Sequence, residues 1–334
     1  LSAGIGYSES QGMLVNASVT QRNFLGTGTR NSLTINNSEQ SEVYELSYTD
    51  PYHTRSGISR SLRANYRSTD TDGGRAFVTR FVTDSYGAGV NYGFPMGERE
   101  TLRFGVDYEH THLKTTGGSP NEVDDYIDTY GDRYGNWELS TGWTYDSRDR
   151  GLFPRSGGRL KTSLSTTGPG SDLEYYRVSL DPQYYIPLGE RATFSLSSRI
   201  GYGDGYGDTD ELPIFERYYS GGTNSVRGFR ANSLGPRDQE NDRALGGSFV
   251  TNASLELMFP PGDGESMRVG FFIDGGNVFA DIDDFDGDEI RASYGAGLNW
   301  LTPVGLLQLS YAQPLIAEDD DELETVQFNI GMPF

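Results

Sequence analysis

The chain has 334 residues, no cysteine and a formal net charge of −21. The lack of thiols excludes a disulfide scaffold, a thiolate metal site and a cysteine nucleophile, and the negative charge disfavours nucleic-acid binding because phosphates would be repelled. The 44 glycines, 22 tyrosines and 17 phenylalanines, against a hydrophobic fraction of only 35%, favour a membrane barrel with a polar interior over a soluble protein with a large aliphatic core.

The chain opens with LSAGIGYSES, which lacks the layout of a signal peptide, so we expect it to begin within a longer precursor. No apolar stretch approaches the roughly 18 residues of a transmembrane helix. Further along, residues 101–112, 175–188 and 290–300 alternate apolar and polar side chains, which is typical of strands. These runs match the ~9–11 residues that a tilted strand needs to cross a bilayer.

The connections between the alternating segments are of two kinds. Short turns rich in proline and glycine lie at 92–99, 151–158, 184–191, 258–265 and 301–307. Longer polar or acidic connections lie at 68–78, 114–134, 203–243 and 279–290. This layout predicts an all-β fold, a closed antiparallel transmembrane β-barrel of about 16 strands, with both termini and the short turns periplasmic and the acidic connections outside. A large soluble all-β protein is the alternative that the same alternation leaves open.

Several motifs that could carry chemistry fail on inspection. His110 and His112 could bind a metal, but both project to the apolar face near a strand end, where an interfacial position is expected. The GxG repeats at 201–207 have no helix after them to bind a phosphate. An EF-hand centred on Gly287 would need an oxygen ligand where Ile282 stands. We therefore expect no metal site, no cofactor and no enzyme activity, and acidic connections that are simply solvated.

The longest connection, 205–243, contains the stretch SGGTNSVRGFR with one central arginine, Arg227. Alternation places the carboxylates of Asp274 and Glu256 on the inward faces of neighbouring strands. The residues that alternate with them and face outward are Val269, Phe271 and Ile273 on one strand and Leu255 and Leu257 on the other. A planar guanidinium can bridge two such acceptors. A solvated arginine at a loop tip is the alternative reading.

This stretch resembles the loop motif of the BamA superfamily, outer-membrane barrels that insert or translocate other proteins. The motif residues are Val226, Arg227, Gly228 and Phe229. The terminal VQFNIGMPF and the segments 23–28, 48–57, 144–160, 252–261 and 268–281 are also similar to that family, so that the resemblance covers Leu1–Phe334.

The resemblance implies that residues 1–334 form the family's barrel domain and that the long outer loop folds inward, with Arg227 docked on Asp274 and Glu256. It also implies POTRA domains upstream, periplasmic lipoproteins bound to them, and unfolded β-barrel clients inserted into outer-membrane lipids without ATP. A two-partner secretion transporter of the same superfamily and a passive porin are the alternatives.

The resemblance further implies a lateral seam between the first and last strands. The residues expected there are Leu1, Ser2, Ala3, Gly4, Ile5 and Gly6 from the first strand and Phe328, Asn329, Ile330, Gly331 and Phe334 from the last. Glycine and serine give the first strand little side-chain packing, and proline near the end donates no ladder hydrogen bond. We expect fewer pairs at this junction than at any other, with Gly4 facing Asn329.

Overall fold

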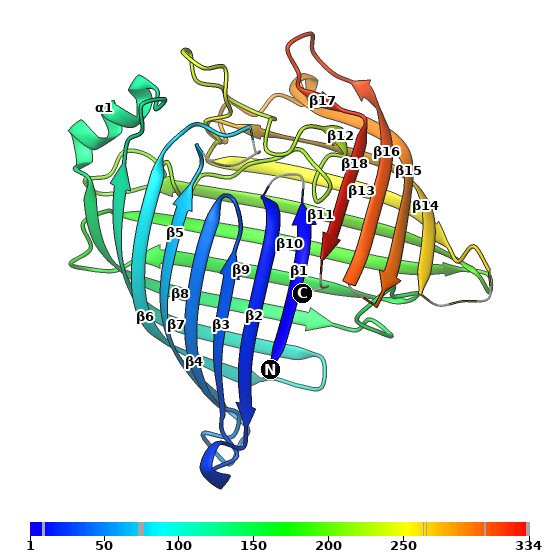
Figure 1. The fold of residues 1–334 in the computed structure, drawn as a ribbon, viewed down its shortest axis with the longest axis horizontal. Coiled ribbons are helices and arrows are strands. Elements are labelled where there is room, and N and C mark those ends of the chain that lie inside the picture. The colour runs from blue at the N-terminus through cyan, green and yellow to red at the C-terminus, as the bar shows by residue number, and fades with distance from the viewer. Residues whose placement is uncertain (9–10, 73–76, 263, 265, 304, 332–334) are drawn as a thin grey trace.

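The computed structural model describes residues 1–8, 11–72, 77–262, 264, 266–303 and 305–331. Within these residues sixteen antiparallel strands close a barrel in which β1 pairs with β18 (Figure 1). Each strand pairs with the barrel strands before and after it along the chain. The all-β class, the closed barrel and the strand number predicted from the sequence are confirmed.

The strands follow the alternating segments of the sequence. The barrel strands are β1 (Ser2–Ser8), β2 (Gly12–Arg22), β3 (Arg30–Asn37), β4 (Ser41–Asp50), β5 (Ser59–Asp70), β6 (Val82–Pro95), β7 (Glu100–Lys114), β8 (Arg133–Asp146), β9 (Gly157–Thr167), β10 (Tyr175–Leu188), β11 (Ala192–Gly205), β13 (Phe249–Phe259), β14 (Met267–Phe279), β15 (Arg291–Thr302), β16 (Gly305–Ile316) and β18 (Val326–Gly331). The other elements are β12 (Gly228–Phe229), β17 (Leu323–Glu324), the helix α1 (Asn121–Tyr130) and the 3₁₀ turns η1 (Phe24–Gly26) and η2 (Gly287–Glu289).

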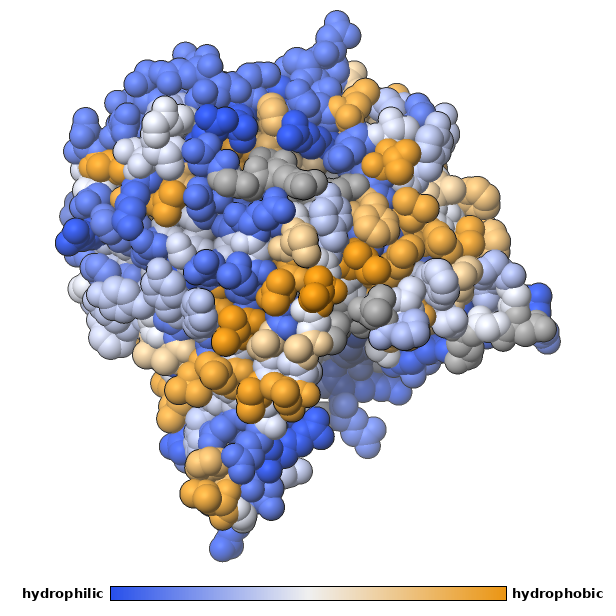
Figure 2. All heavy atoms as spheres, in the orientation of Figure 1, coloured by the Kyte–Doolittle hydropathy of each residue, from blue (hydrophilic) through white to orange (hydrophobic). Residues whose placement is uncertain are grey.

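The outer wall of the barrel is apolar. Leu46, Tyr184, Phe271 and Tyr294 are examples of large apolar side chains that point outward and are exposed. Figure 2 shows such residues gathered across the middle of one face, while hydrophilic residues cover the end with the long connections. An apolar belt between polar ends is what a bilayer requires of a barrel.

The lumen has two chemically different walls. On β1–β4 most inward side chains are hydroxyls or amides, and hydroxyl pairs join neighbouring strands, as between Ser32 and Ser47, whose Oγ atoms are 2.8 Å apart. The opposite wall carries charges, such as the Arg199–Asp181 pair at 3.0 Å. Lys161, one of two lysines in the chain, also lies on the inward face of that wall, in register with Asp181. The interior is therefore polar all round but charged mainly away from β1.

The acidic stretch 121–132 was expected to be a solvated connection, and this expectation is wrong. Most of it forms α1, at the same end of the barrel as β12 and β17 (Figure 1). Val123 and Tyr126 are buried on one face of α1, in an apolar cluster with residues of β8, β10 and the long connection. Its charged residues lie on the remaining surface. The described residues include no helix long and apolar enough to cross a membrane.

Candidate functional site

The connection between β11 and β13, residues 206–248, carries the arginine motif into the barrel. We call residues 226–229 of this long connection the loop tip. Val226 and Phe229 have no exposed surface and pack with Leu234. Gly228 and Phe229 form β12, which pairs with β17 in a two-residue ladder. The loop tip is therefore a packed element inside the barrel and not a solvated turn.

Arg227 lies against Asp274 of β14. Its Nε donates to Asp274 Oδ2 at 2.6 Å, one terminal nitrogen donates to Asp274 Oδ1 at 2.8 Å, and its backbone N–H donates to Oδ2 at 3.1 Å. The Asp274 side chain is completely buried and that of Arg227 is 13% exposed. Such a bidentate, charge-assisted contact fixes both the distance and the orientation of the Arg227 guanidinium relative to the Asp274 carboxylate. The structure thus places Arg227 on the inward-facing carboxylate that alternation predicted for Asp274.

Three further side chains surround the guanidinium. Glu256 Oε2 lies 3.5 Å from the second terminal nitrogen, so the expected second acceptor is present but more distant than Asp274. Ser254 Oγ accepts from Arg227 at 3.1 Å and donates to Asp274 Oδ1 at 2.6 Å. The Phe272 ring centroid lies 3.3 Å from the guanidinium carbon, which adds a cation–π contact. The sequence reasoning placed Ser254 on the same inward face as Glu256 but did not predict that Ser254 or Phe272 would contact Arg227.

Glycine is required at the loop tip. Gly228 has φ +91°, and a Cβ there would lie 3.0 Å from the Ala312 Cβ and 3.5 Å from the Ser293 Cβ. Gly222 has φ +95°, and its N–H donates to the Val226 carbonyl at 3.2 Å. Positive φ values favour glycine at both positions, and the close approach of Gly228 to β16 adds a second reason for a residue without a side chain there.

The long connection also contacts the charged wall of the lumen. Glu216 forms an ion pair with Arg177 of β10, and the Arg177 guanidinium lies 5.1 Å from the Tyr218 ring centroid. Burial raises the pKa of Glu216, and Arg177 opposes that shift. The connection therefore contributes an arginine to one wall and a carboxylate to another. The sequence reasoning used Arg177 only as a member of an alternating strand and missed this contact.

The seam is the junction of β1 and β18. Among the described residues it has two register pairs, Tyr7 with Ile330 and Ser8 with Asn329, whereas every other neighbouring pair in the barrel has at least six. Among the described residues this junction therefore has the fewest pairs, as expected. The Tyr7 and Phe328 rings lie 6.1 Å apart across it.

The predicted register of the seam is wrong. Asn329 faces Ser8 and not Gly4, because β18 pairs with the C-terminal end of β1. Alternation fixes which face a residue occupies, but a shift by two residues leaves every face unchanged. Of the other expected seam residues, Gly331 pairs with Leu306 of β16. The remaining first-strand residues pair with β2 in the described structure, except Leu1, which is exposed, and Phe334 lies outside the described residues.

His110 and His112 lie on the outward face of β7, where His110 pairs with the exposed Tyr86. The His110 ring packs 5.1 Å from the Tyr86 ring, and His112 Nε2 lies 3.2 Å from Asp132 Oδ2. In the part of the chain that the structure covers, no three histidine or carboxylate side chains are placed to hold a metal ion.

Comparisons with known proteins extend these observations. The model of the Omp85 superfamily domain matches residues 23–334. The outer membrane protein assembly factor BamA of Neisseria meningitidis serogroup B is 30% identical over 100% of this chain and 47% of its own length. The chain spans about half the length of the curated relatives it matches first.

Comparison with solved structures supports the same family relationship. The crystal structure of BamA from Haemophilus ducreyi lacking POTRA domains 1–3 superposes with a TM-score of 0.91 at 30% identity, over 98% of this chain and 69% of that one. CdiB from Acinetobacter baumannii superposes with a TM-score of 0.62 at 16% identity, over 98% and 58%, which shows the fold alone. On the family match and the similarity along the whole chain, this protein belongs to the Omp85 superfamily.

Proposed function

We propose that this chain is the membrane barrel of an outer-membrane protein assembly factor, which folds and inserts β-barrel proteins through the seam between β1 and β18. The observation that supports this most directly is the junction itself: among the described residues, two register pairs join β1 to β18, whereas every other junction of the barrel has six or more. The similarity to BamA along the whole chain supports the same role.

The proposed mechanism is strand addition. A strand edge with unpaired backbone groups can pair with an incoming strand, and main-chain hydrogen bonds then supply the affinity. Pairing needs no nucleotide, cofactor or catalytic group, and we propose that the protein is not an enzyme. Clients would be unfolded β-barrel proteins. Periplasmic lipoproteins would attach through POTRA domains upstream of residues 1–334.

Two other functions fit the fold less well. A two-partner secretion transporter would pass its substrate through the lumen, and a porin would conduct through it. The long connection lies across this path: it bonds to β10 through Glu216, to β14 through Arg227, and to the β5–β6 connection, where Val78 pairs with Ala244. The superposition is also closer on BamA than on CdiB.

The function can be tested with the natural full-length protein in lipid vesicles. An unfolded β-barrel client added outside should become protease-resistant at least tenfold faster than in empty vesicles. The same protein in planar bilayers should not give the large, steady conductance of a porin. Folding of the client at the empty-vesicle rate would contradict the proposal, and steady large conductance would favour the porin.

The protein is an integral outer-membrane protein, and we propose that its short turns face the periplasm. Cysteines at Gly117 and Asp284, on long connections, should then react with an impermeant thiol reagent on intact cells. A cysteine at Gly97, on the turn between β6 and β7, should react only after the outer membrane is opened. A β-carbon at Gly117 or Gly97 meets no atom within 4 Å, so the substitutions are tolerable. The reverse labelling pattern would overturn the orientation.

A further inference from the structure

Consecutive residues of the loop tip bind different parts of the barrel. Arg227 binds the β13–β14 wall, while Gly228 and Phe229 bind the strand that closes the seam. We propose that Gln327 of β18 is a positioning residue that ties the seam strand to the docked loop, so that the state of the loop sets how readily the seam opens. This inference rests on the proposed function, in which the seam is where clients pair.

The Gln327 amide is matched to the backbone of the loop tip. Its Oε1 accepts from the Gly228 N–H at 3.2 Å, and its Nε2 donates to the Phe229 carbonyl at 2.7 Å. The side chain has no exposed surface. A buried peptide N–H and C=O both need partners, and the single Gln327 side chain supplies a partner to each of these two groups. No apolar residue and no carboxylate can make both bonds.

The chain leading into β18 is bonded to the same loop. Gly228 and Phe229 pair with Glu324 and Leu323 of β17, and the Arg230 N–H donates to the Glu322 carbonyl at 2.7 Å. Only Thr325 separates β17 from β18. Residues 228–230 therefore pair with or bond to residues 322–324 and Gln327, on both sides of the point where β18 begins.

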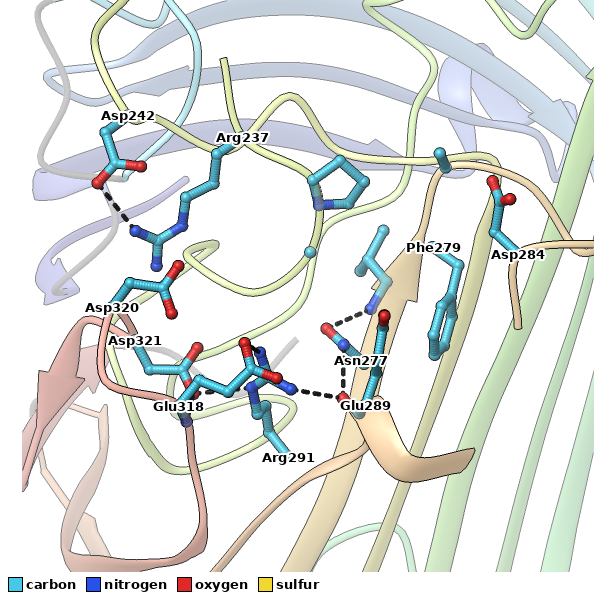
Figure 3. Close-up of a pocket in the computed structure, with 14 residues that line it drawn as sticks. Arg237, Asp242, Asn277, Phe279, Asp284, Glu289, Arg291, Glu318, Asp320 and Asp321 are labelled. Carbon is cyan, nitrogen blue, oxygen red and sulfur yellow. Dashed lines mark hydrogen bonds and ion pairs between the residues drawn. The ribbon is translucent and has the colours of Figure 1, made fainter. Parts of the chain in front are cut away.

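The segment that precedes residues 322–327, namely 318–321, is held in place by Arg291. A cavity of about 540 Å³ is lined by residues of the long connection and of β14. Figure 3 shows Arg291, at the start of β15, facing Glu318 and Asp321 at this cavity. The Arg291 guanidinium contacts Asp321 at 2.7 Å and Glu318 at 2.8 Å, and donates to the Glu289 carbonyl at 2.9 Å. With its start fixed in this way, β18 is positioned from inside the lumen by the loop.

The attachment of β18 to its two neighbours is unequal. It pairs with β16 at six positions and with β1 at two among the described residues. A contact that orients β18 from the lumen therefore matters most for its weaker partner, β1. Loss of the Gln327 amide should leave the ladder between β16 and β18 intact, and it should shift the equilibrium at the seam from paired towards separated β1 and β18.

The test measures the seam directly, in the full-length protein without client. Cysteines at Ser8 and Asn329, which face each other, report seam closure through the rate of disulfide formation. In the Gln327→Ala background we expect that rate to fall at least fivefold. Gln327→Glu should also slow it, because a carboxylate accepts from Gly228 but cannot donate to Phe229. Gln183→Ala, an inward amide on β10, is the matched control and should leave the rate unchanged.

A double-mutant measurement distinguishes coupling of Gln327 to the docked loop from a direct weakening of the seam by the substitution. If Gln327 acts through the docked loop, Gln327→Ala should have little further effect once Arg227→Ala has released the loop. Gln327→Met keeps most of the side-chain volume but makes neither hydrogen bond, and it replaces Gln327→Ala in this measurement if the alanine variant does not assemble. Cross-linking at the wild-type rate in the Gln327→Ala and Gln327→Glu variants, or fully additive effects of Gln327→Ala and Arg227→Ala, would overturn the inference. Because no client is present, neither outcome depends on insertion activity.

Discussion

Replacing Arg227 with alanine should undock the long connection from the lumen wall. Asp274 is completely buried and Glu256 lies nearby, so the variant leaves two like charges without their common cation. Removing one partner of a buried ion pair costs roughly 3–5 kcal/mol, and undocking avoids that cost by letting water reach the carboxylates. On intact cells, an added protease should then cleave between residues 217 and 243 at least tenfold faster than in the wild type.

Two further variants make this result specific. Arg217→Ala removes another arginine of the same connection, whose partner Glu211 is about half exposed, and it should change cleavage little. Asp274→Asn combined with Arg227→Ala removes one of the stranded charges and should restore part of the protection. If the loop of the Arg227→Ala variant resists protease as well as the wild type, the ion pair does not hold the loop in the lumen.

Locking the seam should abolish client insertion. Cysteines at Ser8 and Asn329 lie on facing positions of β1 and β18, and both side chains point into the lumen. Directly opposite residues have Cβ atoms ~4.5–5.5 Å apart, close to the range that a disulfide spans after a small adjustment. In the full-length protein, oxidation should reduce the rate of client insertion at least tenfold, and reduction should restore it.

A second cross-link controls for the chemistry. Cysteines at Ser32 and Ser47, which face each other on β3 and β4, join two strands that have a full ladder. That disulfide should leave insertion unchanged. If the bond between positions 8 and 329 forms completely and insertion proceeds at the wild-type rate, clients do not enter through this junction. Passage through the lumen would then be the better account.

Most of the fold could be predicted from the alternation of apolar and polar residues along the chain. This alternation assigned the inward face to Asp274 and Glu256, and the structure places both there, because a period of two is a direct consequence of strand geometry. It could not place Asn329 opposite Ser8, since register depends on which end of β1 meets β18. It also could not foresee the ladder between β12 and β17, because two residues are too few to show a period.

The helix α1 was missed for a different reason. Its acidic residues dominate the composition of 121–132, yet Val123, Tyr126, Ile127 and Tyr130 recur at helical spacing and pack into the buried cluster. Glu122 and Asp124 in the first turn favour a helix start, and Gly131 ends it with φ +89°. The docking of Arg227 came from family resemblance, because a residue in a long connection has no local period that fixes its destination.

The rarity of lysine provides an intrinsic probe of accessibility. Lys114, at the end of β7, is paired with Asp84 on the outer surface, and Lys161 lies on the inner wall of β9. An amine-acylating reagent therefore meets one side-chain target outside the barrel and one inside it. The ratio of the two acylation rates, read by peptide mass spectrometry, measures how freely small solutes enter the interior. It does so in the unaltered chain, whose lack of cysteine also makes every introduced thiol unique.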